Sequence, residues 1–191
     1  MKKPSESIPR LTDLISLMER LAPPCLAEEW DNCGLQIGSG DWPVRSIWVA
    51  LDPLPAVVKA ASENNVDLLI THHPLFFHPL KRIDLASSPG RIIEAAVKSH
   101  TAIYSAHTNL DSTHEGINDV LARMIGIGET QAMVPVGNDV EIDGHTRNGR
   151  LIGLGRIGDL KTPCSALALA AELKTGFDVI EDTLQRSGSG C

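Results

Sequence analysis

Histidine and aspartate side chains gather in two short segments of this sequence. The segment THHPLFFHP carries His72, His73 and His78, and the segment HTNLDSTH carries His107, Asp111 and His114. Imidazole and carboxylate ligands together suit divalent ions such as zinc, iron, manganese or nickel. The first hypothesis is therefore a metal site that both segments build.

The metal ligands that the sequence predicts are His72, His73 and Asp111. Adjacent side chains of an extended chain point to opposite sides, so the two histidines are expected to serve two neighbouring ions rather than one. Two ions about 3.5–4 Å apart can activate a bridging water and polarise the bond that it attacks. The alternative is that the histidine pair is an ordinary loop feature. His78 and His114 are expected to be surface histidines.

The elements that must position these residues are short strands rich in Val, Ile and Leu, alternating with helical patterns. Strands are expected at residues 46–51, 66–71 and 102–106, and helices at 9–21, 56–65, 91–99 and 115–125. This alternation indicates βαβ crossovers and a parallel sheet. Ligands of such sheets bind beyond the carboxyl ends of the strands, where both histidine segments begin. Asp52, before Pro53 at the end of the first strand, is interpreted as a turn residue rather than a ligand.

The pattern changes after residue 128. Turn signals at 137–138, 143–144 and 148–149 predict short antiparallel strands. A last helix is expected with Thr162 as its cap, Pro163 in its first position and Gly176 past its end. The prediction is a single α/β domain over residues 1–191, with three layers, a largely parallel sheet and a short antiparallel section.

Two further motifs have a functional and a structural interpretation. GLGRIG, residues 153–158, matches the dinucleotide-binding pattern, but no helix is expected to begin before Pro163, so we interpret the glycines as part of a strand or bulge. EEWDNCGLQIG, residues 28–38, could line a pocket with Asp31 or Asn32 as polar contacts. Alternatively, Trp30 covers the core and Asp31 and Asn32 only form a turn.

Composition excludes several classes of protein. Hydrophobic residues make up 42% and charged residues 21%, as in globular proteins, and the formal net charge of -7 argues against nucleic-acid binding. A membrane-spanning helix needs about 20 apolar residues, and no apolar run in this sequence is nearly that long. No secretory signal is visible either, so a cytoplasmic location is expected. The cysteines Cys25, Cys33, Cys164 and Cys191 form no CxxC pair. We expect reduced, mostly structural thiols, with Cys191 exposed.

Several motifs, in the same order along residues 28–160, resemble the Nif-three-like family, often labelled GTP cyclohydrolase 1 type 2 homologues. They are EEWDNCGLQIG, VALDP, ITHHPLFF, YSAHTNLD followed by GIND, and LIGLGRIGDL. The resemblance implies an α/β subunit in a hexameric ring, with two divalent metal ions in each subunit. It places metal ligands at His72, His73 and Asp111, and places His107 beside them rather than among them.

The resemblance also implies a further His and Glu, spaced as H-x-x-x-E, in a C-terminal segment. No histidine follows His145 in this sequence, so we expect a truncated or frameshifted member, or a fragment, with at most one well-held ion. The leading hypothesis is a metal-dependent hydrolase acting on a small-molecule substrate. The second is a non-catalytic metal-binding or scaffolding oligomer, and the third is a nucleotide-binding module that uses the glycines of GLGRIG.

Overall fold

A four-stranded sheet organises the computed structural model, which describes residues 8–136, 139–142 and 145–175. In spatial order the strands are β1 (Gly34–Ile37), β4 (Ala102–Ser105), β3 (Leu68–Thr71) and β2 (Ile47–Ala50). β2, β3 and β4 are parallel, and β1 runs antiparallel beside β4. The expected largely parallel sheet is thus confirmed.

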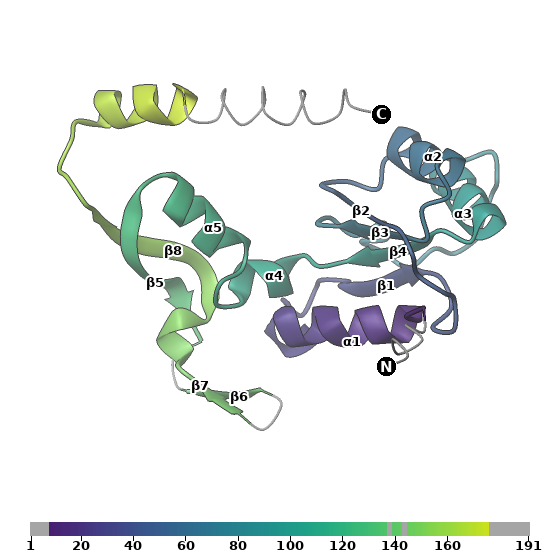
Figure 1. The fold of residues 1–191 in the computed structure, drawn as a ribbon, viewed down its shortest axis with the longest axis horizontal. Coiled ribbons are helices and arrows are strands. Elements are labelled where there is room, and N and C mark those ends of the chain that lie inside the picture. The colour runs from purple at the N-terminus through teal and green to yellow at the C-terminus, as the bar shows by residue number, and fades with distance from the viewer. Residues whose placement is uncertain (1–7, 137–138, 143–144, 176–191) are drawn as a thin grey trace, which may run out of the picture.

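Helices cover both faces of the sheet (Figure 1). The helices α2 (Pro55–Glu63) and α3 (Ser88–Ser99) lie on one face, and α1 (Leu11–Leu21) lies on the other. Successive side chains of a strand alternate between the faces, so Leu68 packs with Leu11 of α1 while Leu69 packs with Val58 of α2. Burying each such aliphatic side chain contributes roughly 1.5–3 kcal/mol. The predicted three layers therefore follow from the alternation within the strands.

The last residues of the three parallel strands stand side by side. Ala50 of β2 pairs with Thr71 of β3, and Thr71 pairs with Ser105 of β4. The segments that follow these strands consequently begin at one edge of the sheet. This is the edge at which the two histidine segments were expected to meet.

A second group of elements lies beside the sheet and is joined to it through α4 (Thr108–Ser112) (Figure 1). It contains the helix α5 (Ile117–Met124) and two antiparallel strands, β5 (Ile127–Pro135) and β8 (Gly153–Leu160). Shorter elements are η1 (Pro24–Leu26), β6 (Val140–Ile142), β7 (His145–Arg147) and η2 (Gly149–Leu151). The antiparallel section is confirmed, although β5 and β8 are longer than the short strands that were expected.

The glycine motif lies within β8, as expected from the distance to the next helix. Gly153 has a φ of +138°, and a Cβ atom there would stand 2.1 Å from the carbonyl oxygen of Val134. The glycine therefore allows β8 to approach β5 closely. The motif serves strand packing, which removes the structural basis for the dinucleotide interpretation.

A buried ion pair joins β8 to α5. The Arg156 side chain donates from Nε to Oδ1 of Asp119 at 2.6 Å and from Nη2 to Oδ2 at 2.8 Å, and the two side chains are only 3% and 7% exposed. Arg156 also donates to the carbonyl oxygens of Thr113, Gly153 and Gly155. Burial alone would raise the pKa of Asp119, but the Arg156 guanidinium holds it below its ordinary value.

The last helix begins later than expected. Residues 166–175 are helical, and the Ser165 hydroxyl accepts a hydrogen bond from the Ala168 amide at 3.2 Å, so Ser165 rather than Thr162 caps the helix. Gly176, Cys191 and the turn signals at 137–138 and 143–144 lie outside the described residues. In the described part of the chain, no helix has the length and apolar character that crossing a bilayer requires.

Candidate metal centre

Three histidines converge at the edge of the sheet where the parallel strands end. His72 and His73 follow β3, and His107 follows β4. One potential ligand atom of each lies within 4.8 Å of the others, and the ring centroids are 5.0–5.4 Å apart. Three imidazoles at this spacing can hold a divalent metal ion.

His72 and His73 share one side of the chain, so the expectation that they would point to opposite sides is wrong. The reason is that β3 ends at Thr71, and the chain bends at both histidines instead of continuing as a strand. Thr71 fixes the bend by donating from its hydroxyl to the His73 carbonyl at 2.8 Å, and Ser105 donates likewise to the His72 carbonyl at 2.9 Å. Strand alternation therefore does not apply at these two residues.

The Nδ1 atom of each histidine already has a partner that can only accept a hydrogen bond. These partners are the Ala106 carbonyl for His72 at 3.1 Å, Asp52 for His73 at 2.6 Å and Asp31 for His107 at 2.9 Å. Each Nδ1 must then carry the proton, which leaves the Nε2 lone pair of a neutral imidazole free. Metal-binding histidines are usually oriented in this way. The donor set fits a divalent ion without rearrangement of these contacts.

Asp111, the third predicted ligand, lies at the margin of the cluster. Its position is in the short helix α4, which forms where a loop was expected. Its Oδ1 atom is 3.8 Å from Nε2 of His72. Burial raises the pKa of Asp111, and the nearby His72 and His107 rings oppose that rise. The structure thus brings Asp111 to the predicted pair, and adds His107 to the imidazole set.

Asp31 is the most strongly bound carboxylate of the site, and its side chain has no exposed surface. It accepts hydrogen bonds from the Thr108 amide and hydroxyl, from Sγ of Cys33 at 2.9 Å and from His107. Burial raises the pKa of Asp31, but the hydrogen bonds from Cys33, His107 and Thr108 outweigh burial and hold it well below its ordinary value. Asp31 is therefore a fixed negative charge behind the His107 ring.

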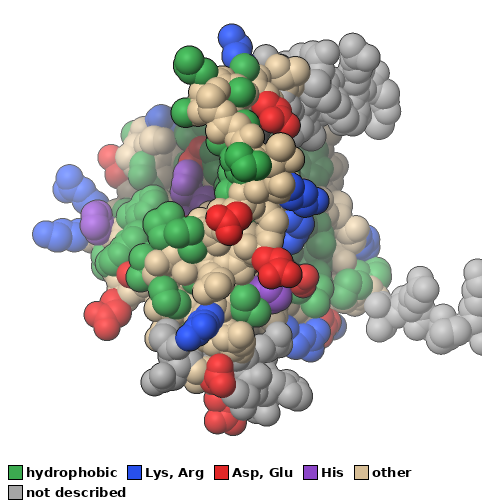
Figure 2. All heavy atoms as spheres, turned by 90° about the vertical axis from the view of Figure 1, so that its left-hand side faces the viewer, with side chains coloured by type: hydrophobic (Ala, Val, Ile, Leu, Met, Phe, Trp, Pro, Cys, Tyr) green, Lys and Arg blue, Asp and Glu red, His purple; other side chains and the backbone are tan. Residues whose placement is uncertain are grey.

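The segment EEWDNCGLQIG lines the metal centre, as its pocket interpretation predicts, because its Asp31 contacts His107. The alternative, in which Trp30 covers the core, is wrong: this side chain is 61% exposed. The ring of Trp30 instead stands edge-on to His107, with centroids 5.9 Å apart, and Phe77 does the same at 5.9 Å. Figure 2 shows histidine side chains within a hollow of the surface, with hydrophobic side chains beside it.

Sequence reasoning missed two residues of the site. The sequence predicts only a turn role for Asp52, yet its carboxylate orients His73. Its place two residues after the end of β2, at the sheet edge where the histidine segments begin, is the signal that identifies it. Cys33 is half-buried and contacts Asp31, whereas Cys25 and Cys164 are exposed, and all three are free thiols.

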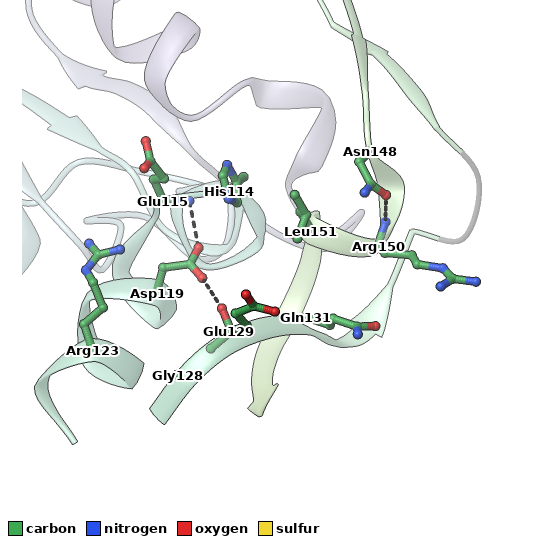
Figure 3. Close-up of a pocket in the computed structure, with 11 residues that line it drawn as sticks. His114, Glu115, Asp119, Arg123, Gly128, Glu129, Gln131, Asn148, Arg150 and Leu151 are labelled. Carbon is green, nitrogen blue, oxygen red and sulfur yellow. Dashed lines mark hydrogen bonds between the residues drawn. The ribbon is translucent and has the colours of Figure 1, made fainter. Parts of the chain in front are cut away.

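A separate cavity of about 560 Å³ lies between α5, β5 and η2 (Figure 3). Asp119 faces it, accepting hydrogen bonds from the Glu115 amide and the Thr130 hydroxyl. The three clustered histidines do not line this cavity, but His114 does, and both His114 and His78 are exposed as expected. Its rim carries arginine and glutamate side chains together, so its charges favour no particular ion.

The family model and the similar known proteins agree on one family. The family model described as Duf34/NIF3 (NGG1p interacting factor 3) matches residues 9–189. The chain is 42% identical over 126 residues to a Bacillus subtilis protein named GTP cyclohydrolase 1 type 2 homolog, which covers 66% of this chain and 34% of that protein. A Streptomyces coelicolor protein of the same name is 34% identical over 164 residues, 86% of this chain and 55% of its own length. The chain thus spans about a third to a half of the length of these relatives.

Solved structures show the same fold. A Bacillus cereus protein related to NIF3 superposes with a TM-score of 0.65 at 43% identity, over 69% of this chain and 36% of that one. Reduced HcgD from Methanocaldococcus jannaschii gives a TM-score of 0.63 at 33% identity, over 78% of this chain and 53% of that one. A Staphylococcus aureus protein superposes with a TM-score of 0.78 over 90% of this chain and 66% of that one. Its sequence is 24% identical, so this likeness shows the fold alone.

Proposed function

This chain belongs to the Duf34/NIF3 family, and we propose that it binds a divalent metal ion through His72, His73 and His107 and uses it to hydrolyse a small-molecule substrate. The observation that supports this most directly is the set of three partnered Nδ1 atoms, which leaves Nε2 of each ring free in a cluster whose ligand atoms lie within 4.8 Å of one another. Asp111 is the fourth ligand in this proposal, 3.8 Å from His72. Such a set suits one ion per chain.

A divalent ion here would lower the pKa of a bound water and polarise the bond under attack. The chain's own residues supply orientation and charge. Asp31 and Asp52 hold two of the imidazoles in the tautomer that offers Nε2, and their negative charge strengthens these rings as donors. Trp30 and Phe77 stand edge-on to His107, whose side chain is only 12% exposed.

The test begins with metal content per chain in the purified protein and in a His72→Ala variant. A His78→Ala variant is the matched control, because His78 is an exposed histidine of the same segment. We expect about one zinc, iron, manganese or nickel ion per chain, loss of most of it in His72→Ala, and no change in His78→Ala. Equal metal content in all three proteins would contradict the site.

Hydrolysis is then measured with GTP, the compound in the relatives' name. Metal-dependent release of product that disappears in His72→Ala supports the enzyme. Bound metal without turnover of GTP or of a panel of esters and phosphoesters supports the second candidate, a non-catalytic metal-binding protein. Exposed apolar side chains favour that candidate, because a scaffold needs surfaces for association.

We also propose that the chain forms a homo-oligomer, with the hexamer that the family resemblance implies as the expected state. Val49 in β2 is 79% exposed and Leu167 is 85% exposed, and Met133 and Ile157 on the β5–β8 pair are also exposed. Contiguous apolar patches mark protein–protein interfaces, and this proposal assigns these side chains to such interfaces. Light scattering should give a native mass of several chains, and a monomeric mass at micromolar concentration would contradict this proposal.

A further inference from the structure

A cavity of about 640 Å³ adjoins the metal centre without containing any of its histidines. Its walls come from β1, from α3 and from the segment that follows the His72–His73 bend. Ile37, Ile93 and Ile83 supply apolar surface, and Lys81 and Arg82 supply two positive charges. This volume is in the range of small-molecule sites, about 300–1,000 Å³.

Hydrogen bonds fix the wall that this cavity shares with the metal centre. Asn32 donates from Nδ2 to the Phe76 carbonyl at 2.7 Å, and Gln36 donates from Nε2 to the Asn32 carbonyl at 2.8 Å. Both Asn32 and Phe76 line the cavity. Their chain neighbours, Asp31 and Phe77, contact His107 of the metal centre. The cavity and the metal centre are therefore lined by neighbouring residues of the same two segments.

The charges of this cavity favour one sign of ligand. Lys81 and Arg82 are exposed, and within the described part of the chain neither side chain has an ion-pair or hydrogen-bond partner. No carboxylate is among the described residues that line the cavity. Two unpaired cations beside an apolar wall match a molecule with an oxyanion at one end and an apolar body at the other. The arginine fork in particular fits phosphate or carboxylate oxygens.

We propose that this cavity binds a small amphipathic organic anion, with its apolar body against Ile37, Ile83 and Ile93 and its phosphate or carboxylate at Lys81 and Arg82. That this anion is also the substrate of the metal centre rests on the proposed function. Binding itself depends on the cavity, which the metal ligands do not line.

Binding is measured by calorimetry with phenyl phosphate and benzoate, which separate phosphate from carboxylate recognition. We expect at least one of the two to bind, and to bind more tightly than phenol, which lacks the charge, and inorganic phosphate, which lacks the apolar body. A Lys81→Gln/Arg82→Gln variant should weaken that binding about tenfold or more. Ile83→Asn, at a position that is 62% exposed, should weaken it as well. Lys161→Gln is the matched control, an exposed lysine after β8, and should bind as the unaltered protein does.

The His72→Ala variant separates this inference from the proposed function. Retained binding in His72→Ala, with the loss of binding in the Lys81→Gln/Arg82→Gln variant, supports the cavity whatever the metal does. Loss in His72→Ala with no change in the double variant would mean that the metal centre itself holds the anion, which overturns the inference. The inference would also be overturned if phenol or inorganic phosphate bound as tightly as both organic anions. It would likewise be overturned if none of these compounds bound.

Discussion

Nδ1 of His107 lies 2.9 Å from Oδ1 of Asp31, a carboxylate whose side chain has no exposed surface. This contact joins the segment before β1 to the segment that follows β4. It holds the imidazole in one tautomer and places a permanent negative charge behind it, because the pKa of Asp31 is lowered by its hydrogen bonds against the effect of burial. The proposed metal centre thus depends on a residue that does not touch the metal.

The first prediction follows from this contact. Asp31→Asn keeps the shape of the side chain but removes its charge, so the His107 ring becomes a weaker and less firmly oriented ligand. We expect metal affinity to fall about 10–100-fold while the fold persists. The measurement is competition for zinc with a chelator of known affinity. Glu63→Gln, at an exposed position in α2, serves as the control. Unchanged affinity in Asp31→Asn would mean that the charge of Asp31 does not strengthen His107 as a ligand.

The sheet and its edge could be predicted from the sequence because the evidence for them is local. Short apolar runs that alternate with helical patterns predict βαβ units, and these units place the residues after each strand at one edge. His72 and His73 were identified in this way. The glycines of GLGRIG were correctly assigned to a strand, because the distance to the next helix is also a local property.

The rest of the site depends on contacts between distant parts of the chain. Asp31 and His107 are 76 residues apart, and Asp52 and His73 are 21 apart, so no local pattern pairs them. The bend at His72 and His73 escaped prediction for a related reason. It is stabilised by Ser105, which lies on another strand. Strand alternation was therefore extended two residues too far.

The second prediction concerns the buried pair between Asp119 and Arg156. Asp119→Ala leaves the guanidinium buried without its carboxylate, and we expect the free energy of unfolding to fall by about 3–5 kcal/mol. Urea denaturation provides the measurement. The exposed pair of Lys59 and Glu63 is the comparison, and Glu63→Ala should cost at most about 1 kcal/mol. A similar cost for both variants would mean that the Arg156 contacts do not stabilise the fold.

The same carboxylate predicts a pH dependence. The pKa of Asp119 in the folded protein lies below its ordinary value of 3.8, so the ionised form contributes stability above that pH. This contribution is lost as the pH falls through the lowered pKa of the folded state. The gap in unfolding free energy between the unaltered protein and Asp119→Asn should therefore be constant from pH 7 to about 5. It should narrow as the pH falls below 3.8. A gap that widens in acid would contradict the lowered pKa.

The last prediction tests what the glycine motif does. Gly153 combines a φ of +138° with a neighbouring carbonyl oxygen, that of Val134, only 2.1 Å from where a Cβ would stand. Gly126 also has a positive φ, of +76°, but nothing lies within 4 Å of its Cβ position, so it is a matched control. Gly126→Ala should cost about 1 kcal/mol for the backbone conformation alone. Gly153→Ala must in addition push β8 away from β5, so its loss of unfolding free energy should be clearly larger. Equal losses would show that the close approach of the strands contributes nothing, and saturable NAD binding that Gly153→Ala abolishes would return the motif to nucleotide recognition.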